Sequence, residues 1–129
     1  MTPPKTATLV IGKNLERVSL LQEWMSDAGA NVMACYDLNL GLEWMMQQDG
    51  FFSKVVLDLQ SLRAKELDPF AQAFEAEFSD LEISVLGRVQ EDGHHSAITG
   101  AMLARASEIT LNAERSHHLS EINQMRHLA

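Results

Sequence analysis

Short apolar runs rich in β-branched residues alternate along the whole chain with stretches of helical periodicity. The five runs occupy residues 8–11, 31–36, 54–59, 83–86 and 108–111. Runs of this length favour buried strands of a parallel sheet, because such strands are apolar on both faces. Their strict alternation with helical stretches predicts a single α/β fold, in which helices cover both faces of the sheet.

Capping residues and apolar spacing indicate where the helices lie. The expected helix starts are Asn14, Asn39, Asp68-Pro69 and Glu114, and the expected glycine ends are Gly29 and Gly50. Phe70, Phe74 and Phe78 fall four residues apart and predict a core-facing stripe. Met45 and Met46 are both expected to face inward.

Length and charge exclude several classes of protein. A chain of 129 residues fits one domain spanning residues 1–129, with residues 1 to about 6 as a tail. The net charge is −8 and no Lys/Arg cluster interrupts the acidity, which argues against direct nucleic-acid binding. No apolar run approaches the roughly 20 residues that span a bilayer. The single cysteine, Cys35, agrees with a reducing compartment, so we expect a cytoplasmic protein.

Candidate functional residues follow the predicted strands, at the sheet edge where ligands bind in open α/β folds. Gly12 and Lys13 follow the first strand, Asp58 ends the third, Gly87 follows the fourth, and Asn112 follows the fifth. The sequence therefore places one carboxylate, one lysine and no acidic pair at this edge.

The order of elements, the length and the apolar run Val55-Val56-Leu57 ending in Asp58 resemble the receiver domain of bacterial two-component response regulators. The resemblance covers nearly the whole chain. It implies a flavodoxin-like sheet with strand order 2-1-3-4-5, sandwiched by five helices. It also implies a role in signal transduction.

The family's phosphorylation site is only partly matched. The resemblance implies that Asp58 stands at the phosphoacceptor position. Gly12 and Lys13 replace the acidic pair that helps to hold Mg²⁺, Gly87 replaces a Thr or Ser, and Asn112 replaces a Lys. Because Mg²⁺ prefers carboxylate oxygens, we expect Mg²⁺-dependent phosphorylation to be very weak or absent, with no metal or cofactor bound.

Two further hypotheses concern charged and metal-ligating side chains. Lys13 could form an ion pair with Asp58 that replaces the missing metal, or it could point into solvent. The histidine pairs at 94–95 and 117–118 could ligate zinc, but adjacent histidines project in different directions, so surface positions are favoured.

These features predict a pseudo-receiver without enzymatic activity, which acts by binding a regulatory partner, its own output domain or a second copy. A functional phosphoacceptor at Asp58, phosphorylated by a histidine kinase, is the alternative. A small enzyme lacks support, since no Gly-rich phosphate loop or nucleophile–base pair is evident. The chain could also be the N-terminal part of a longer regulator.

The resemblance also implies a surface for dimerisation. Receiver domains often pair through the face made by the fourth helix, fifth strand and fifth helix. On this chain that face would include Ala97, Ala101, Arg105, Leu119 and Ile122.

Overall fold

The computed structural model describes residues 6–89 and 95–109. Within them, five parallel strands form one sheet in the order β2-β1-β3-β4-β5. The strands are β1 (Ala7–Ile11), β2 (Val32–Cys35), β3 (Phe52–Asp58), β4 (Glu82–Leu86) and β5 (Ser107–Ile109). The α/β class and the strand order predicted from the sequence are therefore confirmed.

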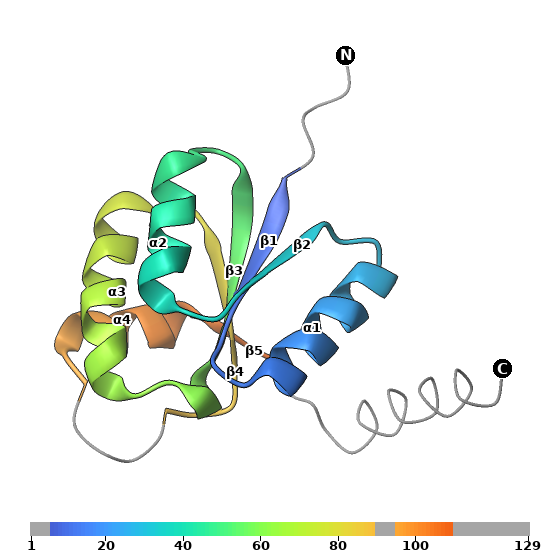
Figure 1. Cartoon of the computed structure of the whole chain (residues 1–129). Helices are drawn as coiled ribbons and strands as arrows, with labels where there is room; N and C mark the ends of the chain where they lie inside the picture. Colours follow the sequence, from blue (N-terminus) through green and yellow to red (C-terminus); the bar gives the residue numbers. More distant parts are fainter. Residues whose placement is uncertain (1–5, 90–94, 110–129) are drawn as a thin grey trace, which may run out of the picture.

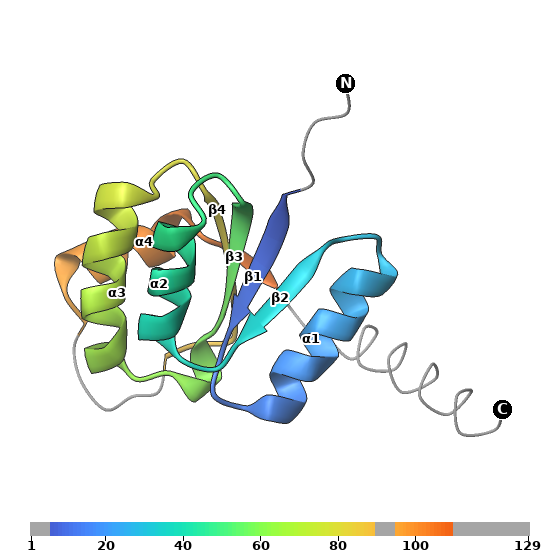
Figure 2. The ribbon, with the colours of Figure 1, turned by 45° about the horizontal axis from the view of Figure 1, so that its top comes forward.

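Four α-helices occur in the described residues: α1 (Leu15–Asp27), α2 (Leu38–Gln47), α3 (Ala64–Glu77) and α4 (Ala97–Arg105). A 3₁₀ turn, η1 (Leu59–Ser61), follows β3. Figures 1 and 2 show α2, α3 and α4 on one side of the sheet and α1 on the other. The predicted fifth helix falls in residues 110–129, outside the described part. None of the described helices has the length and hydropathy of a membrane-spanning segment.

Two apolar clusters fill the space between the sheet and its helices. Leu9 and Leu57 belong to the cluster that includes Phe70 and Phe74 of α3, so this part of the predicted phenylalanine stripe is buried. Successive strand residues point to opposite faces. The neighbouring Val10 and Val56 accordingly pack against Val18 and Leu21 of α1 in a second cluster.

Two predicted helix starts are wrong. Asp37, and not Asn39, caps α2, and its carboxylate accepts a hydrogen bond from the Leu40 N–H at 3.2 Å. Helix α3 begins at Ala64, well before Pro69. Pro69 lacks an N–H and therefore removes one helical hydrogen bond, but it lies on the exposed side of α3.

Other local predictions hold in part. Asn14 caps α1 as expected, and Gly29 and Gly50 adopt the positive φ angles, 95° and 80°, that favour glycine after a helix. Met45 is buried, whereas Met46 is 53% exposed, so the expectation that both face inward is wrong. Adjacent helical residues lie about 100° apart, which leaves room for only one of them against the sheet.

Candidate functional site

Asp58 is the last residue of the central strand β3 and is fully buried. Strand β1 on one side brings Gly12 next to it, and β4 on the other side ends just before Gly87. Gly12, Lys13, Asp58 and Gly87 therefore meet at the carboxyl edge of the sheet, where the sequence placed them. Asn112 lies outside the described residues.

Arg17 is the cation that pairs with Asp58. The side chain of Asn14 accepts a hydrogen bond from the Arg17 N–H at 2.9 Å, which fixes the first turn of α1. From this turn the Arg17 Nε donates to Oδ2 of Asp58 at 2.8 Å. A buried carboxylate is costly unless it is paired, and this bond supplies the pairing charge.

The two oxygens of the Asp58 carboxylate have different surroundings. Oδ2 is bound by Arg17. Oδ1 is buried and has no hydrogen-bond partner among the described residues. An unpaired buried acceptor is costly, so this oxygen is the chemically unsatisfied point of the site.

Lys13 does not pair with Asp58, and the hypothesis of that ion pair is wrong. Its ammonium group instead binds the carboxylate of Glu66 in the first turn of α3. Its backbone N–H donates to the Ser61 hydroxyl at 2.9 Å, and that hydroxyl donates to the Asp58 carbonyl at 3.0 Å. Lys13 thus ties the β1–α1 loop to η1 and α3.

Glu66 is held in its charged form by these neighbours. The hydrogen bond from Lys13 is the main cause that lowers the pKa of Glu66 below its ordinary value of 4.5, and the Arg63 N–H contributes as well. A lowered pKa stabilises the fold above the ordinary value, and this contribution is lost as the pH falls through the lowered one. The effect is small because both side chains of the pair are substantially exposed.

Gly12 leaves no room for the acid that the resemblance would place there. A Cβ atom at this position would lie 2.7 Å from Cβ of Asp58 and 2.9 Å from Cγ2 of Val18. Neither is the free end of a flexible side chain, so any larger residue would force β1, β3 and α1 apart. The missing carboxylate has therefore been replaced by close packing.

Gly87 is restricted by its backbone conformation and is covered by an exposed side chain. Its φ angle of 75° disfavours other residues, and a Cβ atom there would overlap the side chain of Gln60. Gln60 thus fills the space in which the resemblance would place a Thr or Ser side chain.

These residues do not fit a magnesium site. Within residues 6–89 and 95–109, no three His, Cys, Asp or Glu side chains are arranged to hold a metal ion. Asp58 is the carboxylate at the end of β3, and a guanidinium already binds one of its oxygens, while the nearby Glu66 carboxylate is bound by Lys13. Of the histidine pairs considered from the sequence, only His95 lies in the described part, and it is exposed.

The predicted dimerisation surface is described only on α4. Ala97 and Ala101 are exposed there. Arg105 is engaged within the chain, since it donates to Glu75 at 2.9 and 2.7 Å and lies 5.2 Å from the centre of the Phe74 ring. Leu119 and Ile122 lie outside the described residues, so the surface stays a prediction.

Sequence reasoning missed Arg17, although one signal points to it. A cation in the first turn of a helix opposes the helix dipole, which favours anions at that end. An arginine three residues after the Asn14 cap, at the edge that also carries Asp58, therefore indicates a nearby acid. The ion pair with Asp58 was assigned to Lys13 because Lys13 stands at a position that matches the family's acidic pair.

Comparison with known proteins identifies the fold. No family profile matches the sequence, and no curated protein is detectably similar to it. Among solved structures, CheY4 of Vibrio cholerae, a chemotaxis protein, matches with a TM-score of 0.62 and 13% identity, over 94% of this chain and 98% of the other. A receiver-domain protein of Clostridium thermocellum matches with a TM-score of 0.60 and 16% identity, over 96% and 99%.

The pseudo-receiver domain of the CikA protein also matches, with a TM-score of 0.60 and 15% identity, over 81% of this chain and 82% of the other. The chain thus has the fold of response-regulator receiver domains, as the resemblance implied. Because identities this low establish a shared fold alone, function has to be argued from the site.

Proposed function

We propose that this chain is an atypical receiver domain, which acts in signal transduction by binding other proteins or a second copy of itself without being phosphorylated. It has no catalytic activity of its own in this proposal. Its partner is a regulatory protein or its own output domain, in a cytoplasmic setting, and the chain does not contact nucleic acid directly.

The ion pair between Arg17 and Asp58 is the observation that carries this proposal. Phosphoryl transfer to an aspartate needs an accessible carboxylate and a divalent cation that neutralises the phosphoryl oxygens. The Arg17 guanidinium occupies Oδ2 at 2.8 Å and places a fixed positive charge where that cation would be needed. Two positive charges at such short range repel each other strongly inside a protein.

The packing around the pair supports the same conclusion. Gly12 has no space for a metal-binding side chain, and Gln60 covers Gly87. The phosphorylation site is therefore filled by the chain's own atoms on both sides of Asp58.

One observation favours the alternative, in which a histidine kinase phosphorylates Asp58. Oδ1 has no hydrogen-bond partner among the described residues, so one oxygen of the carboxylate is uncommitted. Arg17 would then have to neutralise the phosphoryl charge in place of the metal.

Chemical phosphorylation distinguishes the two functions. The protein is incubated with Mg²⁺ and either acetyl phosphate or beryllofluoride, beside a receiver domain that has an intact acidic pair. We expect no mass increase by intact mass spectrometry and no shift of the Asp58 amide by NMR. Stoichiometric modification that disappears in Asp58→Asn would contradict the proposal and establish the alternative.

A further inference from the structure

The two faces of the sheet are covered unequally within the described residues. Helices α2, α3 and α4 lie on one face, whereas α1 is the only described helix on the other, as Figures 1 and 2 show. On the α1 side, a hollow of about 370 Å³ separates α1 from β4 and β5. Its lining comes from the end of α1 and from the strands, and it includes Trp24, Met25, Ala28, Ser84, Ser107 and Ile109.

Apolar side chains reach this hollow from the core of the α1 side. Trp24, Met25 and Ile109 are only partly buried, and they pack against the buried cluster to which Val56 and Leu86 belong. Burial of such apolar surface stabilises a fold, and parallel sheets are normally covered on both faces. The lining therefore favours an apolar occupant over a charged one.

The chain itself continues from the rim of the hollow. Ile109 ends β5 and lines the hollow, so residue 110 starts beside it. Residues 110–129 lie outside the described part, and their sequence predicts a helix from Glu114 with a stripe of apolar residues. The stripe consists of Leu119, Ile122, Met125 and Leu128. The nearest apolar segment to the hollow thus belongs to the same chain.

The expected helix has the right length to bring two of these residues to the hollow. Ser84 stands two residues before Leu86 at the end of β4, which places it about 7 Å from the carboxyl edge. A helix that follows a parallel strand runs back along the sheet and rises about 1.5 Å per residue. Starting at Glu114, it would reach depths of about 8 Å at Leu119 and about 12 Å at Ile122.

We propose that residues 110–129 cover this hollow in their own chain and that Leu119 and Ile122 fill it. Both side chains are then part of the core and are not available to a dimerisation surface. What remains of that surface on α4 is the exposed pair Ala97 and Ala101, beside an Arg105 that is already bound to Glu75. The inference rests on the proposed function and narrows it to a different protein as partner.

Thermal unfolding tests whether the two side chains are buried. Leu119→Ala and Ile122→Ala should each lower the unfolding midpoint by about 6–20 °C, because they would leave cavities in a core. Leu15→Ala is the matched control, since Leu15 is 61% exposed, and it should change the midpoint by about 2 °C or less. Midpoints in all three variants within that range of the parent chain would refute the docking.

Light scattering on the full chain identifies the source of the occupant. We expect a monomer at every concentration and an unfolding midpoint that does not depend on concentration. A dimer that dissociates in Leu119→Ala would show that these residues serve a second copy, and the proposal would be wrong.

Methyl NMR on the unsubstituted chain gives a direct answer that does not depend on the folding of a variant. Nuclear Overhauser effects should connect the methyl groups of Leu119 and Ile122 with the Trp24 ring and the Ile109 methyls. In a mixture of labelled and unlabelled chains, such effects between chains would overturn the proposal. Their complete absence would also refute it and leave the hollow to another protein. Neither result depends on phosphorylation of Asp58, which the mass-spectrometric experiment decides separately.

Discussion

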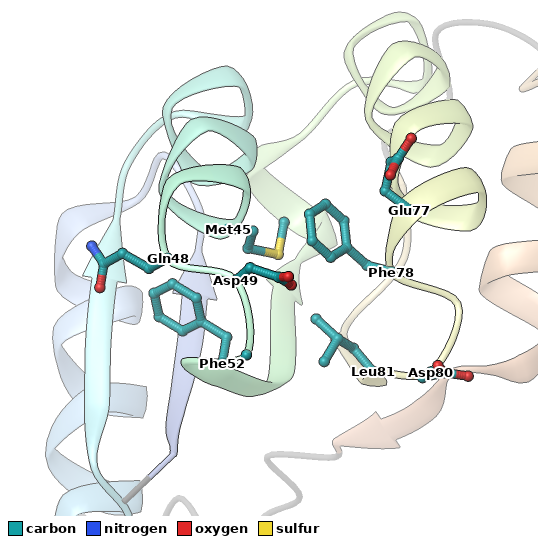
Figure 3. A pocket seen from close by; sticks show the side chains of 9 residues that line it. Met45, Gln48, Asp49, Phe52, Glu77, Phe78, Asp80 and Leu81 are labelled. Carbon is teal, nitrogen blue, oxygen red and sulfur yellow. The ribbon is translucent and has the colours of Figure 1, made fainter. Parts of the chain in front are cut away.

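Among the described residues, the charged side chains around Asp58 are paired at the carboxyl edge of the sheet, whereas three carboxylates at the amino edge are unpaired. At the carboxyl edge, Asp58 pairs with Arg17, and Lys13 pairs with Glu66. At the amino edge, a hollow between the C-terminal ends of α2 and α3 is lined by Asp49, Glu77 and Asp80 (Figure 3), and none of the three has an ion-pair partner among the described residues. A carboxylate that is paired within the chain attracts a further cation only weakly, whereas an unpaired carboxylate attracts it more strongly.

This difference shows that the two edges of the sheet can be altered separately. Closing the carboxyl edge needs only side chains that replace a metal and fill its surroundings. The amino edge is built from other segments, the ends of α2 and α3, and is free to change independently. Substitutions that change side-chain charge or size at each edge test this difference.

Removal of Arg17 should have the largest effect. Arg17→Met leaves Asp58 buried without its cation, and the free energy of unfolding should fall by about 3–5 kcal/mol, the usual cost of breaking a buried pair. Urea unfolding at neutral pH measures this loss. Lys13→Met is the matched control, since it breaks an exposed pair and should cost about 1 kcal/mol or less.

An equal loss of stability in Arg17→Met and Lys13→Met would show that the Arg17 pair is not special. The double variant Arg17→Met with Asp58→Leu provides a further check. Because apolar side chains can replace a buried ion pair, it should recover much of the stability that the single change removes.

A methyl group at Gly12 should have an intermediate effect. Gly12→Ala places a Cβ against Asp58 and Val18, and overpacking of this kind typically costs about 1–3 kcal/mol. Gly100→Ala is the control, because a Cβ in α4 meets only the His95 ring, no closer than 3.4 Å. That change should raise thermal stability slightly through helix propensity, and the same sign for both variants would refute the packing argument.

The smallest expected effect is a gain in stability, and it comes from a substitution at the amino edge. Glu77 is the last residue of α3, where its charge opposes the helix dipole. Glu77→Gln should therefore raise the free energy of unfolding by about 0.3–1 kcal/mol. Destabilisation in the same urea experiment would show that Glu77 has a structural partner and that the amino edge is satisfied like the other.

Much of the fold followed from the sequence because its signals are local. Alternating apolar runs and helical periodicity predicted the parallel sheet, and Asp58 was placed correctly because it follows the apolar run Val55-Val56-Leu57. Helix starts were less predictable. Arg63 is not a usual capping residue, yet it precedes the first residue of α3, and its N–H donates to the Glu66 carboxylate. The stronger signal at Asp68-Pro69 was therefore misleading.

The pairing of charges could not be read from the sequence for a different reason. Lys13 had two acids within reach, Asp58 and Glu66, and which one it binds depends on where α3 begins. The hollow at the amino edge was equally hidden, because Asp49 follows α2 whereas Glu77 ends α3. Such contacts depend on the packing of elements, which periodicity alone does not specify.

The absence of a side chain at Gly12 also bears on evolution. A chain that had merely exchanged its acidic pair for other residues could regain it by single substitutions. Here Asp58 and Val18 lie against the position, so an aspartate would have to arrive together with a shift of the backbone. Close packing at Gly12 therefore makes an acidic pair at this edge unreachable by one substitution alone.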